Sequence, residues 1–547
     1  MLLRISTFVR ACCIVIAVLF NCSFLNAQSQ IAYAVFFTDK NNTAYSLTQP
    51  SAYLSTTSID RRLHQQISID SADLPIVDEY RDSVLSYTNA VLHLQSKWFN
   101  AIVILVNDTT NIPDLINFNF IKEVRKIASY TSPIHAIVNN APVVSSGKPK
   151  PKPTQFDANY YGQAWNQIEI ANGQTLHAQG YEGEGIHIAV IDCGFKGVDT
   201  IEAFSHLFSE HQLVDQYNFV RNNQNIFSED QHGTQVLSTL AAYAPQSFVG
   251  TAPKAQYSLY HTEEPNKEQM IELYNFIAAA ERADSVGVDI ITASLGYNTF
   301  DLTSDDFTYA DLDGNTTIIA KAVNMAFDKG IFCVVSAGNE GNTTWKYILT
   351  PADAKNAFTV GAVTHSKLPS NFTGWGFDLS SKPDVAGLGS QVGIINASGG
   401  LAISYGTSFS TPAIAGLIAC YFQATQPTNL PYVHQFIKSL GHLGIQGFNH
   451  EIGTGIPDFG NALSIAKYLK YSISIYPNPC KNNLFINHGL LLQHTQYIVV
   501  NMLGQVMLTG TLQAAEHIIN TATLQRGNYL LHIYNAQISE SIPFIKD

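Results

Sequence analysis

The chain has 547 residues, of which 46% are apolar, 11% aromatic and 13% charged. Chains of this length usually fold as several domains, about three or four here, and this composition supports large buried cores. It excludes a single small binding module and a disordered protein. Asp and Glu number 43 against 30 Lys and Arg, for a net charge of −13, which argues against nucleic acid or an anionic membrane as the partner of the whole chain.

Residues 1–27 have the pattern of a secretory signal peptide. Arg4 and Arg10 precede an apolar run from Ala11 to Phe20, and small residues lie just before Gln28, as signal cleavage requires. A membrane anchor is the alternative, but the uncharged stretch is shorter than the roughly 20 residues that a span needs. The sequence therefore predicts an exported protein.

Four cysteines follow the predicted signal peptide: Cys193, Cys333, Cys420 and Cys480. The first three lie in apolar stretches, and the fourth lies in a different region of the chain. Free, buried thiols are therefore favoured over a disulfide framework, even in an exported protein.

Residues 28–140 predict a small α+β domain. Apolar runs of strand length lie at 31–37 and 101–106, while the stretches 59–63 and 113–120 look helical. Such a mixture without regular alternation is typical of an α+β fold.

Residues 141–159 predict an accessible linker. Prolines alternate with lysines at its centre, and proline removes the backbone donors that helices and sheets need. The lysines are interpreted as solubilising residues in preference to a binding site.

Residues 160–470 predict an α/β domain with a parallel sheet covered on both faces. Continuous apolar strands alternate with helices, which is typical of parallel sheets. The predicted strands are 187–191, 256–260, 289–293 and 331–335, and the predicted helices are 267–283, 317–329 and 408–423.

Residues 471–547 predict a small β-sandwich. Short strands recur at close spacing and are separated by turn-forming residues. The predicted strands are 473–476, 484–486, 497–500 and 529–534.

Two polar residues stand at element ends in the α/β region. Asp192 closes the first strand before a glycine-containing turn, where it can either orient a histidine or simply cap the loop. His232 opens an apolar-periodic helix, where it is either a proton acceptor or a capping residue.

Two further residues complete a possible mechanism. Ser408 stands at the start of a helix, whose amide dipoles favour a developing negative charge, so it is a candidate nucleophile as well as a candidate N-cap. Asn339 follows a buried strand in a glycine-rich turn, where its amide can donate to an oxyanion or serve as an ordinary turn residue. The order Asp, His, Ser differs from that of the chymotrypsins and of the α/β-hydrolases.

The segments around these four residues closely resemble the subtilisin-like serine peptidases over about residues 160–468. The resemblance implies a subtilisin-like fold in which Asp192 orients His232, His232 is the general base, Ser408 is the nucleophile and Asn339 lies in the oxyanion hole. It is carried by the segments Ala189–Gly194, His232–Val236, Ser336–Gly341 and Gly406–Pro412.

The same resemblance implies where substrate binds. Ser294, Leu295 and Gly296 are similar to the wall of the first specificity pocket, and Glu340 is expected at its rim, favouring cationic or polar side chains. Cys193 stands where Thr or Ser is usual in the family. Its position beside Asp192 predicts inhibition by thiol-binding metals.

The chemistry implied by the resemblance requires no cofactor. A structural calcium site is one interpretation of Asp311, Asp313 and Asn315, whose alternating oxygen side chains resemble the start of a calcium loop. The other interpretation is a solvated turn, because the stretch lacks a clear distal Glu.

The flanking regions carry resemblances of their own. Lys97–Ala101 and Phe120–Val124 are similar to inhibitory propeptides, which implies a domain that assists folding and blocks the cleft; a retained structural domain is the alternative. The last 75 or so residues resemble the C-terminal sorting domains of type IX secretion substrates, which implies contact with that secretion machinery. The motifs are Tyr476–Pro479, Asn501–Gln505 and Leu524–Leu530.

The sequence therefore predicts a secreted serine endopeptidase made as a precursor, acting on protein or peptide substrates outside the cell or at the outer cell surface. No nucleic-acid partner is expected. Two alternatives stay open: a catalytically silent surface-binding protein on the same scaffold, and an enzyme of narrower chemistry, such as an esterase or a processing peptidase.

Overall fold

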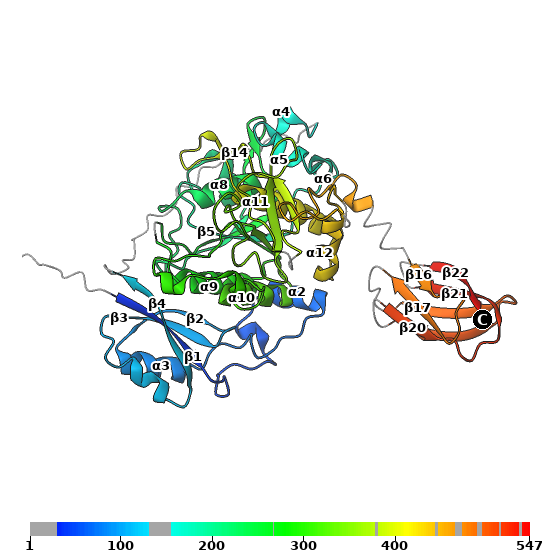
Figure 1. Cartoon of the computed structure of the whole chain (residues 1–547), viewed down its shortest axis with the longest axis horizontal. Coiled ribbons are helices and arrows are strands. Elements are labelled where there is room, and N and C mark those ends of the chain that lie inside the picture. Colours follow the sequence, from blue (N-terminus) through cyan, green and yellow to red (C-terminus); the bar gives the residue numbers. More distant parts are fainter. Residues whose placement is uncertain are drawn as a thin grey trace, which may run out of the picture. The chain divides into compact units, whose positions relative to one another are not determined.

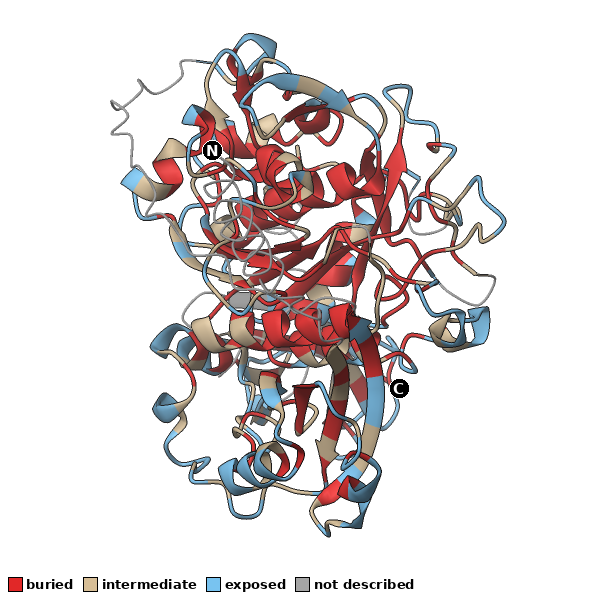
Figure 2. Cartoon of the chain, turned by 90° about the vertical axis from the view of Figure 1, so that its left-hand side faces the viewer, coloured by how far each residue is buried: buried red, intermediate tan, exposed pale blue. Residues whose placement is uncertain are grey.

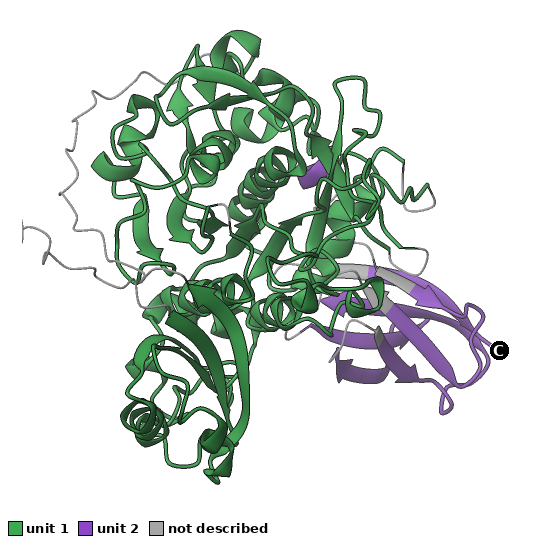
Figure 3. Cartoon of the chain, turned by 60° about the vertical axis from the view of Figure 1, so that its left-hand side comes forward, with its two compact units in different colours: residues 1–460 green, residues 461–547 purple. Residues whose placement is uncertain are grey.

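A computed structural model describes residues 30–130, 155–265, 267–377, 381–443, 447–464, 473–488, 495–512, 516–534 and 539–547. The chain divides into two compact units, residues 1–460 and 461–547 (Figure 3). The predicted signal peptide and residues 141–154 of the predicted linker lie outside the described residues.

The first unit begins with a four-stranded antiparallel sheet in the order β2-β3-β1-β4. Its apolar residues enter two different cores. Val35 and Ile104 pack in a core with Val84 of the covering helix, whereas Ala34 and Val103 belong to the large core of the α/β region. The elements are β1 (Gln30–Phe37), α2 (Thr56–Gln65), α3 (Asp78–Thr88), β2 (Val91–Ser96), β3 (Ala101–Val106) and β4 (Ile121–Tyr130), with short 3₁₀ helices η1 (Pro50–Ala52) and η2 (Pro113–Asn117).

Both faces of this sheet are covered, which explains why β3 is apolar at every position and wholly buried. The strands predicted at 31–37 and 101–106 and the helix at 59–63 are present. The helix predicted at 113–120 is wrong in type and length, because the structure has only the short 3₁₀ helix η2 there.

The α/β region is built on a seven-stranded sheet in the order β13-β12-β11-β10-β5-β9-β6, and all of its pairings are parallel. The four predicted strands are its centre, and β6, β12 and β13 extend it at the edges. The strands are β5 (His187–Asp192), β6 (Leu213–Asn218), β9 (Gln256–His261), β10 (Ile290–Ala293), β11 (Phe332–Ser336), β12 (Phe358–Val363) and β13 (Val385–Leu388). The predicted parallel α/β fold is confirmed.

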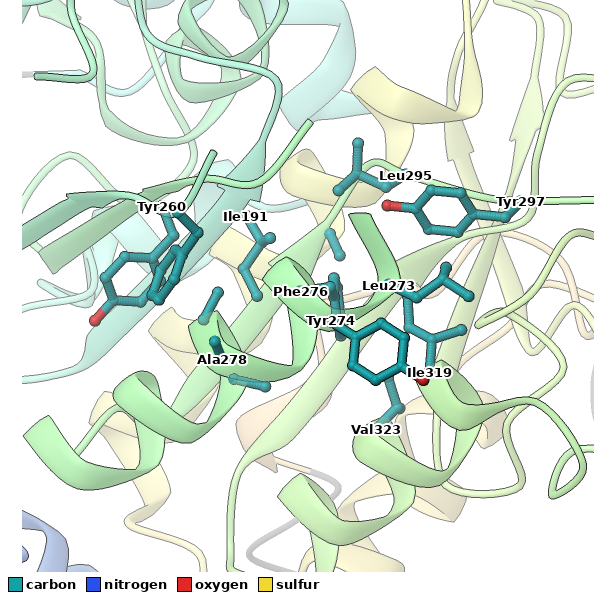
Figure 4. Packing of buried hydrophobic residues seen from close by; sticks show 14 of the residues in the cluster. Ile191, Tyr260, Leu273, Tyr274, Phe276, Ala278, Leu295, Tyr297, Ile319 and Val323 are labelled. Atoms are coloured by element: carbon teal, nitrogen blue, oxygen red, sulfur yellow. The ribbon is translucent and has the colours of Figure 1, made fainter. Parts of the chain in front are cut away.

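Two pairs of long helices cover this sheet on opposite sides (Figure 1). Helices α8 (His232–Ala241) and α11 (Thr407–Thr425) pack against each other, and so do α9 (Ile271–Val286) and α10 (Ile318–Asp328). The second pair lies between the large sheet and the N-terminal sheet. Figure 4 shows side chains of α9 and α10, such as Leu273 and Val323, gathered below residues at the sheet such as Ile191. Figure 2 shows that most residues of the large sheet and of these helices are buried.

Shorter elements surround these layers. The hairpin β14–β15 is antiparallel and leads into α11. The remaining elements are α4 (Ala158–Tyr161), α5 (Trp165–Glu169), α6 (Gln174–Ala178), η3 (Glu202–Phe204), α7 (Ser205–Ser209), β7 (Tyr243–Ala244), β8 (Phe248–Val249), η4 (Thr303–Asp305), η5 (Tyr309–Asp311), β14 (Val392–Ile395), β15 (Leu401–Ser404) and α12 (Leu430–Ser439).

The second unit consists of two antiparallel sheets, ordered β16-β17-β20 and β19-β18-β21-β22. Leu484 of the first sheet and Leu531 of the second belong to one core, and β21 alternates buried and half-buried residues as one face of a sandwich should. The strands are β16 (Ile473–Tyr476), β17 (Asn483–His488), β18 (Gln496–Asn501), β19 (Val506–Thr511), β20 (Glu516–Asn520), β21 (Gly527–Tyr534) and β22 (Ser539–Lys546). The predicted β-sandwich is confirmed.

The four cysteines after the predicted signal peptide are all free thiols, as predicted. Cys333, Cys420 and Cys480 are buried, whereas Cys193 is only half-buried. Among the described residues, no helix is both long enough and apolar enough to cross a membrane.

Candidate active site

Asp192 is the last residue of β5, near the centre of the parallel sheet. Its side chain is wholly buried. One carboxylate oxygen, Oδ1, accepts a hydrogen bond from the Cys193 backbone N–H at 2.8 Å and lies 2.6 Å from Nδ1 of His232. The other oxygen, Oδ2, has no hydrogen-bond partner among the described residues. The Asp192 carboxylate therefore contacts His232 through one oxygen, Oδ1, and one ring nitrogen, Nδ1.

His232 is the first residue of α8, where Asp230 Oδ1 accepts a hydrogen bond from its backbone N–H at 2.7 Å. Gly233 lets this helix end approach Asp192, because a Cβ there would lie 2.4 Å from the carbonyl oxygen of Gly194. Burial lowers the pKa of His232, but the charge and hydrogen bond of Asp192, with a contribution from Asp230, raise it above its ordinary value overall. The ring is thus held with Nδ1 toward Asp192, and its protonated form is stabilised.

Ser408 is the second residue of α11, and its neighbour Phe409 has its ring centroid 6.0 Å from that of His232. This contact places the start of α11 beside the histidine. Ser408 is 7% exposed, so neighbouring residues cover most of its surface. The helix N-terminus directs its amide groups toward this position.

A proline shapes the backbone of Ser408. The carbonyl of Ser408 would normally accept a helical hydrogen bond from the residue four positions on, which is Pro412 and has no N–H. The hydroxyl of Ser294 supplies the missing donor at 2.9 Å. Ser294 thus fixes the first turn of α11, a role that the sequence did not predict.

Asn339 lies just after β11 and is oriented by the residue before Ser408. Its Oδ1 accepts hydrogen bonds from the Thr407 backbone N–H at 2.9 Å and from the Thr407 hydroxyl at 3.1 Å. Because a backbone N–H can only donate, the side-chain oxygen must face Thr407 and the Nδ2 amino group must point elsewhere. Gly406, at φ +144°, lies close to this amide. Asn339 therefore offers a fixed donor beside Ser408.

The other predicted pocket residues lie around the same end of the sheet. Ser294 and Leu295 follow β10 and are buried. Gly296 approaches Leu349 so closely that a Cβ would lie 2.8 Å from its side chain. Glu340 is half-buried, and its Oε2 accepts a hydrogen bond from the Asn339 N–H at 2.6 Å. Burial raises the pKa of Glu340, and its carboxylate braces the turn that carries Asn339.

The predicted metal ligands Asp311, Asp313 and Asn315 take part in local turns. Asp311 accepts hydrogen bonds from the N–H and hydroxyl of Thr308, both at 2.7 Å. Asp313 Oδ1 accepts from the backbone N–H groups of Asn315 and Thr316. These bonds give the carboxylates of Asp311 and Asp313 hydrogen-bond partners without a cation. The calcium site stays a prediction.

The N-terminal domain binds the far side of the catalytic region through buried charges on α9. Arg62 forms hydrogen bonds of 2.8 and 2.9 Å with both oxygens of Asp73 in its own domain and two of 2.8 Å with Asp284 of α9. Arg61 reaches the same Asp284 at 2.6 Å. The Arg62 and Asp284 side chains are 1% and 0% exposed. A single aspartate thus joins two arginines across the interface.

A second carboxylate on α9 completes this interface. Glu281 accepts hydrogen bonds from the backbone N–H groups of Lys97 and Trp98, at 2.8 and 3.1 Å, and from the hydroxyl of Ser96. It thereby caps the turn between β2 and β3. Phe36 also packs on Tyr274 with ring centroids 6.4 Å apart, so the interface combines apolar packing with charges.

Comparison with known proteins agrees with this architecture. Residues 183–455 match the family model for the subtilase family, Peptidase S8. Residues 32–140 match the Peptidase S8 propeptide domain of Bacteroidota, and residues 474–546 match a secretion system C-terminal sorting domain. The three matches follow the order of the domains in the structure.

Individual relatives are peptidases of the same kind. A thermophilic serine proteinase of Bacillus sp. (strain AK1) is 28% identical over 342 residues, covering 60% of this chain and 75% of the relative. Subtilisin DY of Bacillus licheniformis is 28% identical over 254 residues, covering 46% and 82%. The crystal structure of the epidermin leader peptide processing serine protease of Staphylococcus aureus aligns with a TM-score of 0.53 at 16% identity, covering 80% of this chain and 98% of that one.

The chain is therefore a serine peptidase of the subtilase family. It carries a Bacteroidota-type propeptide domain before the peptidase domain and a secretion sorting domain after it.

Several positioning residues were missed by the sequence reading. Thr407 orients Asn339, and Asp230 accepts from the His232 backbone. A signal for Ser294 was present in the sequence, because Pro412 lies one helical turn after Ser408 and leaves a carbonyl without its donor. Nothing in the sequence indicates which of the neighbouring hydroxyls supplies it.

Proposed function

We propose that the protein is a secreted endopeptidase that hydrolyses peptide bonds through Asp192, His232 and Ser408, with Asn339 in the oxyanion hole. In this mechanism the Ser408 hydroxyl attacks the carbonyl carbon while His232 Nε2 accepts its proton. The Nδ1–H group donates to Asp192, whose negative charge stabilises the imidazolium as it forms.

The remaining steps use the same groups. The developing oxyanion accepts hydrogen bonds from Asn339 Nδ2 and from amides at the start of α11. Collapse of the intermediate expels the amine with the proton from His232 and leaves an acyl-enzyme on Ser408. Water, deprotonated by His232, then releases the acid product and restores the serine.

The observation that carries the proposal is the orientation of Asn339. Thr407, the residue before the proposed nucleophile, holds the amide oxygen of Asn339 and so leaves the amino group as a donor next to Ser408. This arrangement gives an acceptor to the Thr407 N–H, which the uncapped start of α11 would otherwise leave unpaired, and at the same time turns the Asn339 amino group away from Thr407. It suits a site where negative charge develops on a substrate oxygen.

A fluorophosphonate probe tests the chemistry, because it phosphonylates only an activated serine. We expect the mature protein to be labelled and the Ser408→Ala variant to remain unlabelled. Ser410→Ala is the matched control: Ser410 lies on the same helix and donates to the Thr407 carbonyl, so labelling should persist. Absence of labelling in the wild-type protein would favour the silent binding protein.

Substrate range is tested by comparing turnover of an unfolded protein with that of small esters, followed by mass spectrometry of the cleaved peptides. A general endopeptidase cuts the unfolded protein at many sites. Cleavage at a single motif indicates a processing peptidase, and ester turnover alone indicates an esterase. The residue before each cut also tests the predicted influence of Glu340.

The flanking domains support maturation and export. The N-terminal domain, bound through Arg61, Arg62 and Glu281, would act as a folding aid and inhibitor until it is removed. The C-terminal domain would deliver the enzyme through the secretion machinery to the cell surface or the medium. Deleting residues 471–547 should retain the protein inside a secretion-competent Bacteroidota host, while the N-terminal signal still removes it from the cytoplasm.

A further inference from the structure

Three different potential metal ligands meet at the candidate active site. One carboxylate oxygen of Asp192, the Sγ atom of Cys193 and one ring nitrogen of His232 all lie within 4.8 Å of one another. In the described part of the chain, this is the one group of three or more acidic, cysteine or histidine side chains that lie so close together. Neighbouring ligands of a tetrahedral zinc ion are about 3.3–3.8 Å apart, given bonds of about 2.0–2.3 Å. Small side-chain rotations would therefore bring these three atoms onto one ion.

A second observation points to a cation at this place. Asp192 is wholly buried, yet its Oδ2 atom has no hydrogen-bond donor among the described residues, while Oδ1 receives both the Cys193 N–H and His232. Buried carboxylate oxygens are normally satisfied. An unpaired one beside a thiol and an imidazole leaves a ligand position open to a positive ion.

The cluster can be reached from solvent. The His232 side chain is 31% exposed and Cys193 is half-buried, in the full chain with its N-terminal domain in place. An ion can thus approach from the imidazole side. The combination of thiolate, imidazole and carboxylate is preferred by Zn²⁺ and ions like it, and disfavoured by Ca²⁺ and Mg²⁺, which prefer oxygen ligands alone.

We propose that Asp192, Cys193 and His232 form an inhibitory site for Zn²⁺ or a similar borderline-soft divalent ion. The inhibitory consequence rests on the proposed function, whereas the binding site itself does not. It sharpens the expectation from the sequence, because Cys193 acts with the two triad residues instead of as an isolated thiol.

Occupation of the site removes the general base whichever ring nitrogen binds. An ion on Nε2 takes the lone pair that would accept the Ser408 proton. An ion on Nδ1 displaces that nitrogen's proton, which moves to Nε2 and occupies the same lone pair. In both cases the Cys193 thiol releases its proton to solvent as it becomes a thiolate ligand. We therefore expect kcat to fall while KM changes little, and a chelator to restore activity.

The inhibition experiment titrates the active protein with Zn²⁺ and then adds a chelator. Cys193→Ser keeps the size of the side chain but removes the soft ligand. Cys420→Ser is the control, because Cys420 is buried and donates to the Thr251 carbonyl, a bond that serine can keep. For each variant, activity with Zn²⁺ is divided by its own activity without Zn²⁺. We expect Cys193→Ser to need at least tenfold more Zn²⁺ for half-inhibition, and Cys420→Ser to match the wild type.

A binding experiment without turnover separates the site from the chemistry. Co²⁺ is added to the full-length Ser408→Ala chain, and the thiolate-to-cobalt charge-transfer absorption is recorded. The band should appear in Ser408→Ala and in Ser408→Ala/Cys420→Ser, and should disappear in Ser408→Ala/Cys193→Ser. Equal bands or equal Zn²⁺ sensitivity with and without Cys193 would overturn the proposal. A normal cobalt band in a chain whose wild type lacks peptidase activity would instead refute the proposed function and leave the site standing.

Discussion

The two helical layers of the catalytic sheet differ in how they use polar groups. The layer of α8 and α11 carries His232 and Ser408. Apart from the contact of His232 with the Asp192 carboxylate, the contacts described for it are neutral hydrogen bonds, such as that of the Ser294 hydroxyl to the Ser408 carbonyl. The layer of α9 and α10 faces the N-terminal domain and presents the buried carboxylates of Glu281 and Asp284 to cationic and amide groups.

The difference follows from what each layer must do. Reacting groups need fixed positions within one folded unit, and neutral hydrogen bonds between neighbouring elements provide this at little desolvation cost. If the N-terminal domain is removed, as proposed, the surface that it covered must remain soluble when exposed. Charges on α9 meet that need, because they pair across the interface when covered and are hydrated when free. The helices that carry His232 and Ser408 thus lie on one face of the sheet, and the helices that contact the N-terminal domain lie on the other.

The largest effect is expected from Asp192→Asn, which alters the proposed triad and leaves the contact of α9 with the N-terminal domain unchanged. The substituted amide can donate to Nδ1 of His232 and so stabilise the tautomer with its proton on Nε2, which cannot accept from Ser408. We expect kcat to fall by about 10⁴-fold with little change in KM. Steady-state kinetics on a peptide substrate measure the loss, and Asp199→Asn, on the following loop, is the control. A loss below about tenfold would contradict the role of Asp192.

The contact of α9 with the N-terminal domain is tested by Arg62→Met in the full-length Ser408→Ala chain, which lacks the proposed nucleophile and so should not cut itself. Removing the guanidinium takes one cationic partner from each of two buried carboxylates. Asp73 keeps Lys329, and Asp284 keeps Arg61 and Lys97. The cost should therefore lie below the about 3–5 kcal/mol that a fully unpaired buried charge carries. Hydrogen exchange of the α9 amides, followed by mass spectrometry, should accelerate accordingly.

Arg81→Met is the matched control for this variant. Arg81 pairs with Asp78 and Asp82 on the exposed surface of α3, where an ion pair contributes less than about 1 kcal/mol. The same exchange rate in both variants would mean that the charges on α9 do not hold the N-terminal domain.

A smaller effect is expected from Ser294→Ala, which leaves the Ser408 carbonyl without a donor. An unsatisfied buried acceptor costs about 1–3 kcal/mol, so we expect kcat to fall roughly 5- to 150-fold as the start of α11 loosens. Adding Pro412→Ala restores an N–H at the position that a regular helix uses, and should recover part of kcat. If the double variant is no better than Ser294→Ala, the hydroxyl acts on substrate and not on the helix.

The smallest effect concerns pH. The pKa of His232 is raised, and only neutral imidazole accepts a proton, so kcat/KM should increase with pH along a limb whose pKa exceeds the ordinary value of about 6.5. Asp230→Asn removes a negative charge that favours imidazolium, so this limb should move to lower pH by a few tenths of a unit. Asp230→Glu, which keeps the charge, should leave it in place.

The sequence predicts those parts of the molecule that depend on local pattern. The four central strands are continuous apolar runs, and the proposed catalytic residues stand at the ends of strands or at the starts of helices, where chemistry in a parallel sheet is expected. The edge strand β6 was missed because it is partly exposed and contains Asp215 and Gln216. Strand β13 was missed because two of its four residues are Ala386 and Gly387, which are infrequent in strands.

Contacts between distant segments could not be predicted. Arg62 and Asp284 are 222 residues apart and lie in different domains, and no local property of either residue indicates its partner. The same holds for Thr407 and Asn339, 68 residues apart. Such pairs depend on how the sheets and helices pack together, which periodicity and residue type do not determine.

The parallel order of the large sheet has a consequence for the timing of activity. Asp192, His232, Asn339 and Ser408 reach one place only through successive crossover connections, so no fragment that ends before α11 contains the site. Structures dominated by such distant contacts form slowly and late. If these residues carry the chemistry, as proposed, an unfolded chain has no peptidase activity even before its N-terminal domain has folded, because the site requires the whole sheet.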